Sequence, residues 1–337
     1  MLDKAQIRTR ILELVAREPT GLTSRLAAEF KTSRQNANRH IQYLEVEGLI
    51  QGSGKTRGRE YRLSVLDQDS RRYTREGLSE DVVWREAFAP HLADLSDNVR
   101  AIWQYGVTEM VNNAIDHSGS TAIAVGIRRN ALYTDGWVGD DGEGIFLKIQ
   151  RVLGLYDPRE SILELAKGKL TTEPERHTGE GIFFTSKVFD RFDIRSGRLH
   201  FLHDGEPLDL FLERPDDAPG TVVIMRLANQ SMRTTKAVFD EFAPPDDFTF
   251  AKTIVPVRLA LYEGENLVSR SQAKRLYMRF ERFQNVVLDF AGVAEIGQAF
   301  ADELLRVFAE AHPTVKLAPT NMNDAVKAMI LRVLQRS

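Results

Sequence analysis

Three polar residues in segment 103–118 have types and spacing that suit chemistry on a bound ligand. Glu109, Asn113 and Asp116 recur at i, i+4 and i+7, so they share one face of a predicted helix, and apolar residues occupy the opposite face. A carboxylate one turn before an amide can act as a general base beside a hard cation that prefers oxygen ligands. Taken alone, a polar face of this kind is more often only solvated.

Three further boxes follow this helix along the chain. Segment 131–145 reads as a strand ending in DDGEG at 140–144, and segment 177–190 is a Gly-x-Gly turn that opens a helix. Segment 219–227 is a Gly-Thr entry into a buried strand. Between the first two boxes, a polar stretch that includes AKGKLTTEPERHTG is long enough for a mobile lid. Each box alone is common by chance, but the ordered set is specific.

The ordered set resembles the ATP-binding fold shared by gyrase, Hsp90, histidine kinases and MutL, over roughly residues 95–228. The resemblance implies that ATP and Mg²⁺ are cofactors, with Asn113 as the Mg²⁺ ligand and Glu109 as the catalytic base. It also implies that the Asp140 carboxylate accepts a hydrogen bond from the exocyclic amine of adenine and that Thr221 assists adenine binding. The implied nucleotide contacts are Asn113, Asp116, Asp140, Gly142, Gly144, Lys167, Lys169, Thr171, Thr172, His177, Thr178, Gly179, Gly181 and Thr221. Whether ATP is hydrolysed, transferred or only bound stays open.

The first 65 residues, called here the head, predict three helices followed by a β-hairpin. The spacing of apolar residues indicates a first helix at about 4–17, a second capped by Thr23 or Ser24, and a third capped by Ser33. GLIQ and REYRL read as two strands joined by a glycine-rich tip. The head carries 12 Lys or Arg against 7 Asp or Glu, a net charge of +5, whereas the rest carries −8. This asymmetry favours a polyanion as the partner of the head.

The hairpin tip contains Gly-Ser-Gly-Lys-Thr, which looks like the end of a P-loop. A P-loop needs a glycine five residues before Gly54, where this chain has Leu49, and it needs a strand before and a helix after. Three helices and a hairpin instead resemble the winged helix-turn-helix family, which implies double-stranded DNA as the partner. The implied DNA contacts, on the third helix and the wing, are Ser33, Arg34, Gln35, Asn36, Asn38, Arg39, Lys55, Arg57 and Arg59. The alternative is a winged helix used only for protein contacts.

Beyond the PPDD segment at 244–247, predicted strands and helices alternate, which indicates an α/β layer. VVLDFAGVAEIGQAFADELL resembles the STAS fold of anti-sigma-factor antagonists, which implies a module that binds a protein partner. In the antagonists a phosphorylatable serine stands near the start of the helix, but residues 296–300 here are IGQAF and carry no hydroxyl. The sequence therefore argues against a phosphoserine switch, and a packing or dimerisation domain is an equal alternative.

Together these patterns predict a multidomain α+β protein. We expect a winged helix-turn-helix domain at 1–65, an α/β sandwich of the GHKL (Bergerat) ATP-binding fold at 66–245 and a small α/β STAS-like domain at 246–337. The chain has no cysteine, no apolar run of membrane-spanning length and no signal peptide, which predicts a cytoplasmic protein without membrane contact.

The expected function is that of an ATP-binding, slowly hydrolysing, DNA-binding regulator. In it, Mg²⁺·ATP occupancy and lid closure control the winged helix and the STAS-like module. One alternative is a protein kinase that resembles anti-sigma factors and phosphorylates a separate partner. Another is an ATP-gated clamp like MutL, which would act as a homodimer.

Overall fold

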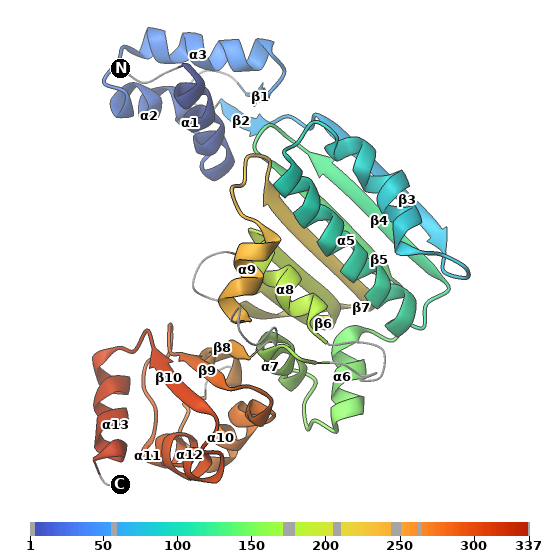
Figure 1. Cartoon of the computed structure of the whole chain (residues 1–337). Helices are drawn as coiled ribbons and strands as arrows, with labels where there is room; N and C mark the ends of the chain where they lie inside the picture. Colours follow the sequence, from blue (N-terminus) through green and yellow to red (C-terminus); the bar gives the residue numbers. More distant parts are fainter. Residues whose placement is uncertain are drawn as a thin grey trace.

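The computed structural model describes residues 4–54, 59–170, 179–204, 210–243, 251–261 and 265–335. The chain is a mixed α/β protein of several regions, which Figure 1 shows in order from the head (blue) to the C-terminal region (red). Residues 66–245 are called here the middle region, and residues 246–337 the C-terminal region. Within the described ranges, no helix combines the length and the apolar character that crossing a membrane requires.

The head consists of three helices and a two-stranded sheet. Its elements are α1 (Lys4–Arg17), α2 (Leu22–Glu29), α3 (Arg34–Val46), β1 (Ile50–Ser53) and β2 (Glu60–Leu63). The strands pair antiparallel, with Ile50 opposite Leu63, as the predicted hairpin requires. The helices and strands bury an apolar cluster of their own, with Ile11, Leu26 and Ile41 at 1% exposure or less.

The helix starts in the head show one prediction confirmed and one wrong. Ser33 caps α3, because its hydroxyl accepts a hydrogen bond from the Asn36 amide at 3.1 Å. The predicted cap of α2 is wrong, since that helix begins at Leu22 after Gly21, whose φ of 67° is left-handed. Thr23 and Ser24 therefore lie inside the first turn, and glycine takes the backbone conformation that turns the chain into the helix.

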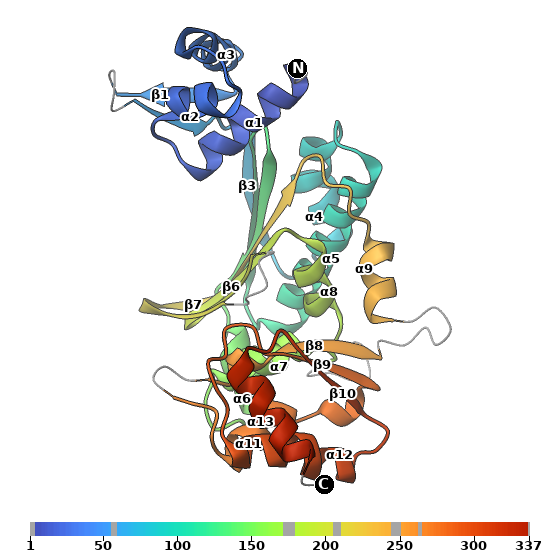
Figure 2. The same ribbon diagram turned by 90° about the vertical axis from the view of Figure 1, so that its left-hand side faces the viewer.

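The middle region is a five-stranded antiparallel sheet with helices packed on one face (Figures 1 and 2). The strand order is β3-β4-β5-β7-β6, for β3 (Asp67–Thr74), β4 (Ala122–Arg129), β5 (Tyr133–Asp140), β6 (Arg191–His203) and β7 (Leu210–Ala228). The helices are α4 (Glu80–Val83), the π-helix η2 (Trp84–Phe88), the 3₁₀-helix η3 (Ala89–Leu92), α5 (Asp97–His117), α6 (Ile145–Leu153), α7 (Glu160–Lys167), α8 (Gly181–Val188) and α9 (Thr235–Phe242).

Helix α5 packs closely because its inner face is apolar and contains a glycine. Ile102, Trp103 and Val107 are fully buried. A Cβ added at Gly106 would lie 2.4 Å from the ring of Phe189, so only glycine allows this approach. The segment that the apolar pattern predicts as helical is therefore the central helix of the region.

Strand β3 is an element that the sequence analysis missed. It pairs with β4 along its whole length, from Asp67 opposite Arg129 to Thr74 opposite Ala122. It lies at the edge of the sheet, and its sequence DQDSRRYT contains one large apolar side chain, Tyr73. Because strand prediction relies on alternating apolar residues, the polar sequence at this domain boundary gave no sign of a strand. Residue 66 therefore leads from the head directly into the sheet.

The C-terminal region alternates strands and helices as predicted. Its elements are β8 (Lys252–Pro256), η4 (Val257–Ala260), α10 (Arg270–Tyr277), η5 (Phe280–Arg282), β9 (Asn285–Asp289), α11 (Gln298–Asp302), η6 (Glu303–Val307), α12 (Phe308–Ala311), β10 (Lys316–Thr320) and α13 (Asp324–Leu334). The three strands are parallel in the order β10-β9-β8. Segment 269–283, SRSQAKRLYMRFERF, has a helical pattern throughout, but α10 ends at Tyr277, and Arg279 takes a left-handed φ of 67° soon after it.

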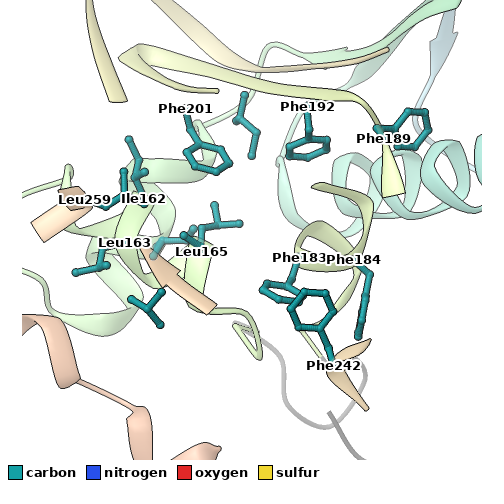
Figure 3. Packing of buried hydrophobic residues seen from close by; sticks show 14 of the residues in the cluster. Ile162, Leu163, Leu165, Phe183, Phe184, Phe189, Phe192, Phe201, Phe242 and Leu259 are labelled. Carbon is teal, nitrogen blue, oxygen red and sulfur yellow. The ribbon is translucent and has the colours of Figure 1, made fainter. Parts of the chain in front are cut away.

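The apolar core divides the molecule differently from the predicted domains. One cluster of buried side chains runs through both the middle and the C-terminal regions, from Val83 to Val333. Figure 3 shows part of it, including Ile162 and Leu163 on α7 and Leu259 on η4. The head cluster is separate. Ala131 and Leu132, in the turn between β4 and β5, pack against it from the middle region.

Candidate functional site

A cavity of about 320 Å³ lies between α5, α6, α8, the end of β5 and the part of β7 that pairs with it. Four segments that are far apart in the sequence contribute polar or glycine residues to its wall. Those that the sequence analysis predicted are Glu109, Asn113, Asp140, Gly144, Gly179, Gly181 and Thr221. Its apolar lining includes Val138, Ile149 and Val223, so the cavity offers an apolar wall and a polar rim, as small-molecule sites commonly do.

Helix α5 places Glu109 and Asn113 one turn apart on the cavity wall. The Asn113 Nδ2 atom is buried and makes no hydrogen bond within the described residues. A buried amide with unused hydrogen-bonding capacity is expected where a ligand completes the site. The Glu109 carboxylate lies against the start of α8, because a Cβ added at Gly181 would meet its Oε2 atom at 1.9 Å. Glycine at that position is therefore what allows the carboxylate to reach the helix start.

Asp140, the last residue of β5, also lines the cavity. Burial raises the pKa of its carboxyl, and nearby Asp141 adds to the rise, although the amides of Gly142 and Thr221 donate hydrogen bonds that oppose it. The Gly142 amide lies 2.9 Å from Asp140 Oδ1. Thr221 faces Asp140 across the β5–β7 pair, and its hydroxyl accepts a hydrogen bond from the Ile145 amide at 3.0 Å. The two predicted adenine contacts are thus direct neighbours.

The loop between β5 and α6 has no room for side chains at its glycines. A Cβ added at Gly142 would lie 1.9 Å from the carbonyl oxygen of Ser118, at the end of α5. Gly144 has a φ of 91°, which few other residues adopt, and it lines the cavity. Gly142 itself does not line the cavity, but it fixes the path of the loop that does.

Lys148 is a cavity residue that the sequence analysis missed. It lies on α6, lines the cavity, and its Nζ atom donates a hydrogen bond to the His117 carbonyl at 2.9 Å. The signal that could have found it is its spacing, because Lys148 falls one turn after Gly144 on a helix that begins beside the site. It supplies the cavity with a cation from a well-packed helix.

The structure corrects the role predicted for two lysines. Lys167 is fully buried and forms an ion pair with Glu164, and its Nζ also donates to the Met278 carbonyl at 2.9 Å. Lys169 donates to the Arg282 carbonyl at 3.0 Å. Both side chains therefore turn toward carbonyls of the C-terminal region and do not line the cavity, and Glu164 on α7 itself also pairs with Lys167.

The other predicted nucleotide contacts divide into two groups. Asp116 is exposed and does not line the cavity, so α5 contributes two of the three predicted polar residues. Thr171, Thr172, His177 and Thr178 lie outside the described residues. In the part of the chain that is described, no three His, Asp or Glu side chains form a metal site. A cation here would need Asn113 together with oxygens from the ligand or from water.

The predicted DNA contacts on α3 lie mostly at the surface. Ser33, Arg34, Gln35 and Arg39 are exposed, whereas Asn36 and Asn38 are half-buried. The carboxamide of Asn36 is bonded within the head, since it donates to Thr32 and accepts from Arg39 at 2.6 Å. The surface of α3 therefore presents two arginines and a glutamine near its start.

The wing is described only in part, since Lys55 and Arg57 lie outside the described residues. The Arg59 side chain forms an ion pair with Glu45 at 2.5 Å and lies over the ring of Tyr61. Glu45 is on α3, so Arg59 ties the hairpin to that helix. The predicted phosphate contact of Arg59 stays a prediction, and this side chain, still partly exposed, would have to share its guanidinium between Glu45 and a phosphate.

Comparison with known proteins identifies one region of the chain. Residues 272–327 match the model of a family described as a STAS-like domain of unknown function (DUF4325). The C-terminal region is therefore STAS-like, as the sequence predicts, and no curated protein matches the chain.

Among solved structures, the chain is similar to a possible transcriptional regulator, YydK, from Bacillus subtilis subsp. subtilis str. 168. The match has 12% identity and covers 67% of this chain and 95% of that chain. Its TM-score is 0.15, and a match at that score carries no argument about fold or function.

Proposed function

We propose that the cavity binds Mg²⁺·ATP and that nucleotide occupancy regulates DNA binding by the head. The observation that carries the proposal is the convergence of Glu109, Asn113 and Asp140 on one cavity. These residues come from boxes whose order resembles that of the GHKL ATP-binding fold. Their convergence is what that resemblance requires, because none of the boxes binds a nucleotide alone.

The Asp140 end of the cavity suits adenine. A carboxylate accepts a hydrogen bond from an exocyclic amine, and the backbone amides of Gly142 and Thr221 donate hydrogen bonds to Asp140 that hold its side chain in place. Thr221 stands beside it and provides a second polar group. Val138, Ile149 and Val223 supply the apolar surface on which a flat ring can pack.

The Asn113 end suits the phosphates. Asn113 lines the cavity, and its carboxamide oxygen can bind Mg²⁺, which otherwise keeps water and phosphate ligands. Gly179 and Gly181 line the cavity at the start of α8, where backbone amides and the helix dipole favour anions. Lys148 adds a positive charge. Glu109, next to the start of α8, is placed to accept a proton from a water molecule if ATP is hydrolysed.

The head is proposed to bind double-stranded DNA through α3. Arg34, Gln35 and Arg39 are exposed on one short helix, and arginine and glutamine can make bidentate contacts with base edges. The net charge of +5 on residues 1–65 supports binding to a polyanion. Nucleotide can control this binding only if it favours one arrangement of the regions over another.

Calorimetric titration with Mg²⁺·ATP tests the nucleotide site. Asn113→Ala should remove the Mg²⁺-dependent part of the affinity, roughly tenfold or more for one lost charge-assisted contact of 1.5–3 kcal/mol. Asp116→Ala is the matched control, because Asp116 lies on the same helix but outside the cavity. Absence of ATP binding by the wild-type chain, or equal losses in both variants, would contradict the proposal.

The proposal that nucleotide regulates DNA binding is tested by DNA titration with and without Mg²⁺·ATP at several salt concentrations. Nucleotide should change the DNA affinity of the wild-type chain and leave that of Asn113→Ala unchanged. Identical DNA affinity under all four conditions would rule out regulation while leaving ATP binding intact. Labelled ATP then distinguishes the enzymatic alternatives, because hydrolysis releases free phosphate and a kinase transfers it to protein.

A further inference from the structure

Helix α7 lies between the cavity and the STAS-like region and contributes to both. Leu165, on this helix, and Leu170, shortly after it, line the cavity. Glu164 and Lys167, also on α7, instead bond to residues of the C-terminal region. All eight residues of α7 are buried. Helix α7 is therefore shared by the cavity and the C-terminal region. A movement of the C-terminal region that displaced α7 would also change the lining of the cavity.

Arg279 of the C-terminal region makes the most extensive contact with this helix. It is 7% exposed, and its Nη1 atom donates to Glu164 Oε2 at 2.9 Å. Its Nη2 atom donates to the carbonyls of Gly168, at 3.2 Å, and of Lys169. One guanidinium thus holds the end of α7 and the two residues that follow it.

The turn that Arg279 holds leads directly to the cavity. The amide of Leu170 donates to the carbonyl of Gly179 at 3.0 Å, and both residues line the cavity. Lys169, whose carbonyl accepts from Arg279, immediately precedes Leu170. A short series of bonded neighbours therefore connects the guanidinium with the phosphate end of the cavity.

Neighbouring contacts make the attachment rigid. The Thr253 hydroxyl, on β8, donates to the Lys167 carbonyl at 2.7 Å. The Lys167 ammonium bonds to Glu164 and to the Met278 carbonyl. Two buried basic side chains, Lys167 and Arg279, thus share the carboxylate of Glu164, and each also donates to backbone carbonyls. These bonds have specific buried partners and so favour one docked geometry, although the Arg279 Nε atom makes no hydrogen bond within the described residues.

Backbone strain is concentrated at the same contact. Lys169 and Arg279 have φ values of 49° and 67°, in the left-handed region that residues with side chains rarely adopt. The two strained residues meet at the hydrogen bond from Arg279 Nη2 to the Lys169 carbonyl. Strain of this kind persists only where the surroundings determine it, and it is common at functional sites.

We propose that Arg279 is a positioning residue for the nucleotide cavity. The docked STAS-like region, through Arg279, fixes the turn at 168–169 and with it the approach of Leu170 and Gly179 to the ligand. The inference rests on the proposed function, since it assigns the C-terminal region a part in nucleotide binding. Because coupling between two sites is reciprocal, nucleotide must strengthen docking by the same factor by which docking strengthens nucleotide binding.

The test uses the full chain and the variants Arg279→Ala and Arg279→Lys, with Arg306→Ala as control. Arg306 lies on the same region but pairs with Asp302 within it. Arg279→Ala should weaken Mg²⁺·ATP binding by roughly tenfold, within the usual range for coupled sites. Arg279→Lys keeps the charge but replaces the planar fork, whose two Nη atoms reach Glu164 and the turn at 168–169 separately, by a single donor atom. Its Mg²⁺·ATP affinity should therefore fall between those of the wild-type chain and Arg279→Ala. Arg306→Ala should bind as the wild-type chain does.

Hydrogen exchange reports docking independently of affinity. Mg²⁺·ATP should slow exchange in residues 270–283 of the wild-type chain and have no such effect in Arg279→Ala, which a purely structural role would not produce. Wild-type affinity in both Arg279 variants would overturn the positioning role and leave the proposed function intact. If Arg279→Ala does not fold, wild-type affinity in Arg279→Lys overturns it alone. A wild-type chain that binds no ATP overturns both.

Discussion

Asp140 is a carboxylate held in an environment that disfavours its charge. Burial raises its pKa, and the amides of Gly142 and Thr221 only partly offset the loss of water. A buried acid of this kind lowers the stability of the protein without its ligand, and such costs are common where groups are arranged for function. The carboxylate at this position therefore serves the proposed adenine contact but lowers the stability of the ligand-free protein.

We predict that Asp140→Asn makes the ligand-free protein more stable than wild type as pH rises from about 4 to neutrality. An acid with a raised folded-state pKa binds its proton more tightly when folded, so the stability it contributes below the unfolded pKa is lost as pH rises through the folded pKa. Asparagine keeps an oxygen for the Gly142 amide but carries no charge. Thermal unfolding across this pH range is the measurement. Parallel curves for the two proteins would contradict the prediction.

At the scale of single elements, α3 illustrates how a cap and a contact surface can coincide. Ser33 ends the preceding loop, caps the helix through the Asn36 amide and is exposed beside Arg34. Truncation of Ser33 to alanine would therefore change both the stability of the helix and the proposed contact with DNA, and the two effects could not be told apart. Substitution by aspartate separates them, because aspartate caps as well as serine does but repels phosphate.

We predict that Ser33→Ala destabilises the head by about 1 kcal/mol, the usual cost of a lost cap. Ser33→Asp should retain the stability and lose DNA affinity. Chemical unfolding followed by circular dichroism measures the first effect, and DNA titration measures the second. Wild-type DNA affinity in Ser33→Asp would show that the start of α3 does not face DNA.

The sequence predicted the elements that carry a periodic apolar pattern, such as α1, α5, β4 and β9. It missed β3, where polar residues such as Arg71 and Arg72 occupy an edge strand. It located Glu109, Asn113 and Asp140 at the cavity because each lies in a recognisable box. It misjudged Lys167 because nothing in the local pattern shows that another region will bury this side chain. Contacts between segments that are distant in the sequence were therefore the main feature that could not be predicted.

At the scale of the whole molecule, the middle and C-terminal regions form one core, although the sequence divides them at the PPDD segment. Side chains of α7 pack with those of η4 inside this cluster. The head has its own core and meets the middle region through the turn at 131–132. The physical units are thus the head on one side and everything after it on the other.

We predict that a chain ending at residue 243 is far less stable than the full chain, whereas a chain starting at residue 66 keeps most of its stability. The first truncation exposes side chains such as Ile162 and Leu163, at about 1.5–3 kcal/mol for each large apolar group. Scanning calorimetry of both truncations is the measurement. Unfolding of the 1–243 chain at the full-length temperature would refute the shared core.

Strand β5 gives the molecule a mechanical property. The turn before it packs on the head, and its last residue, Asp140, lies in the cavity about 24 Å away. Because β4 and β7 bond to both of its edges, the strand cannot slip in register. Any rotation of the strand would therefore be shared with the sheet, and over this length a tilt of about 2.5° would displace one end relative to the other by roughly 1 Å. The length of one strand thus sets the ratio between a change in the orientation of the head and the shift it would produce at the cavity.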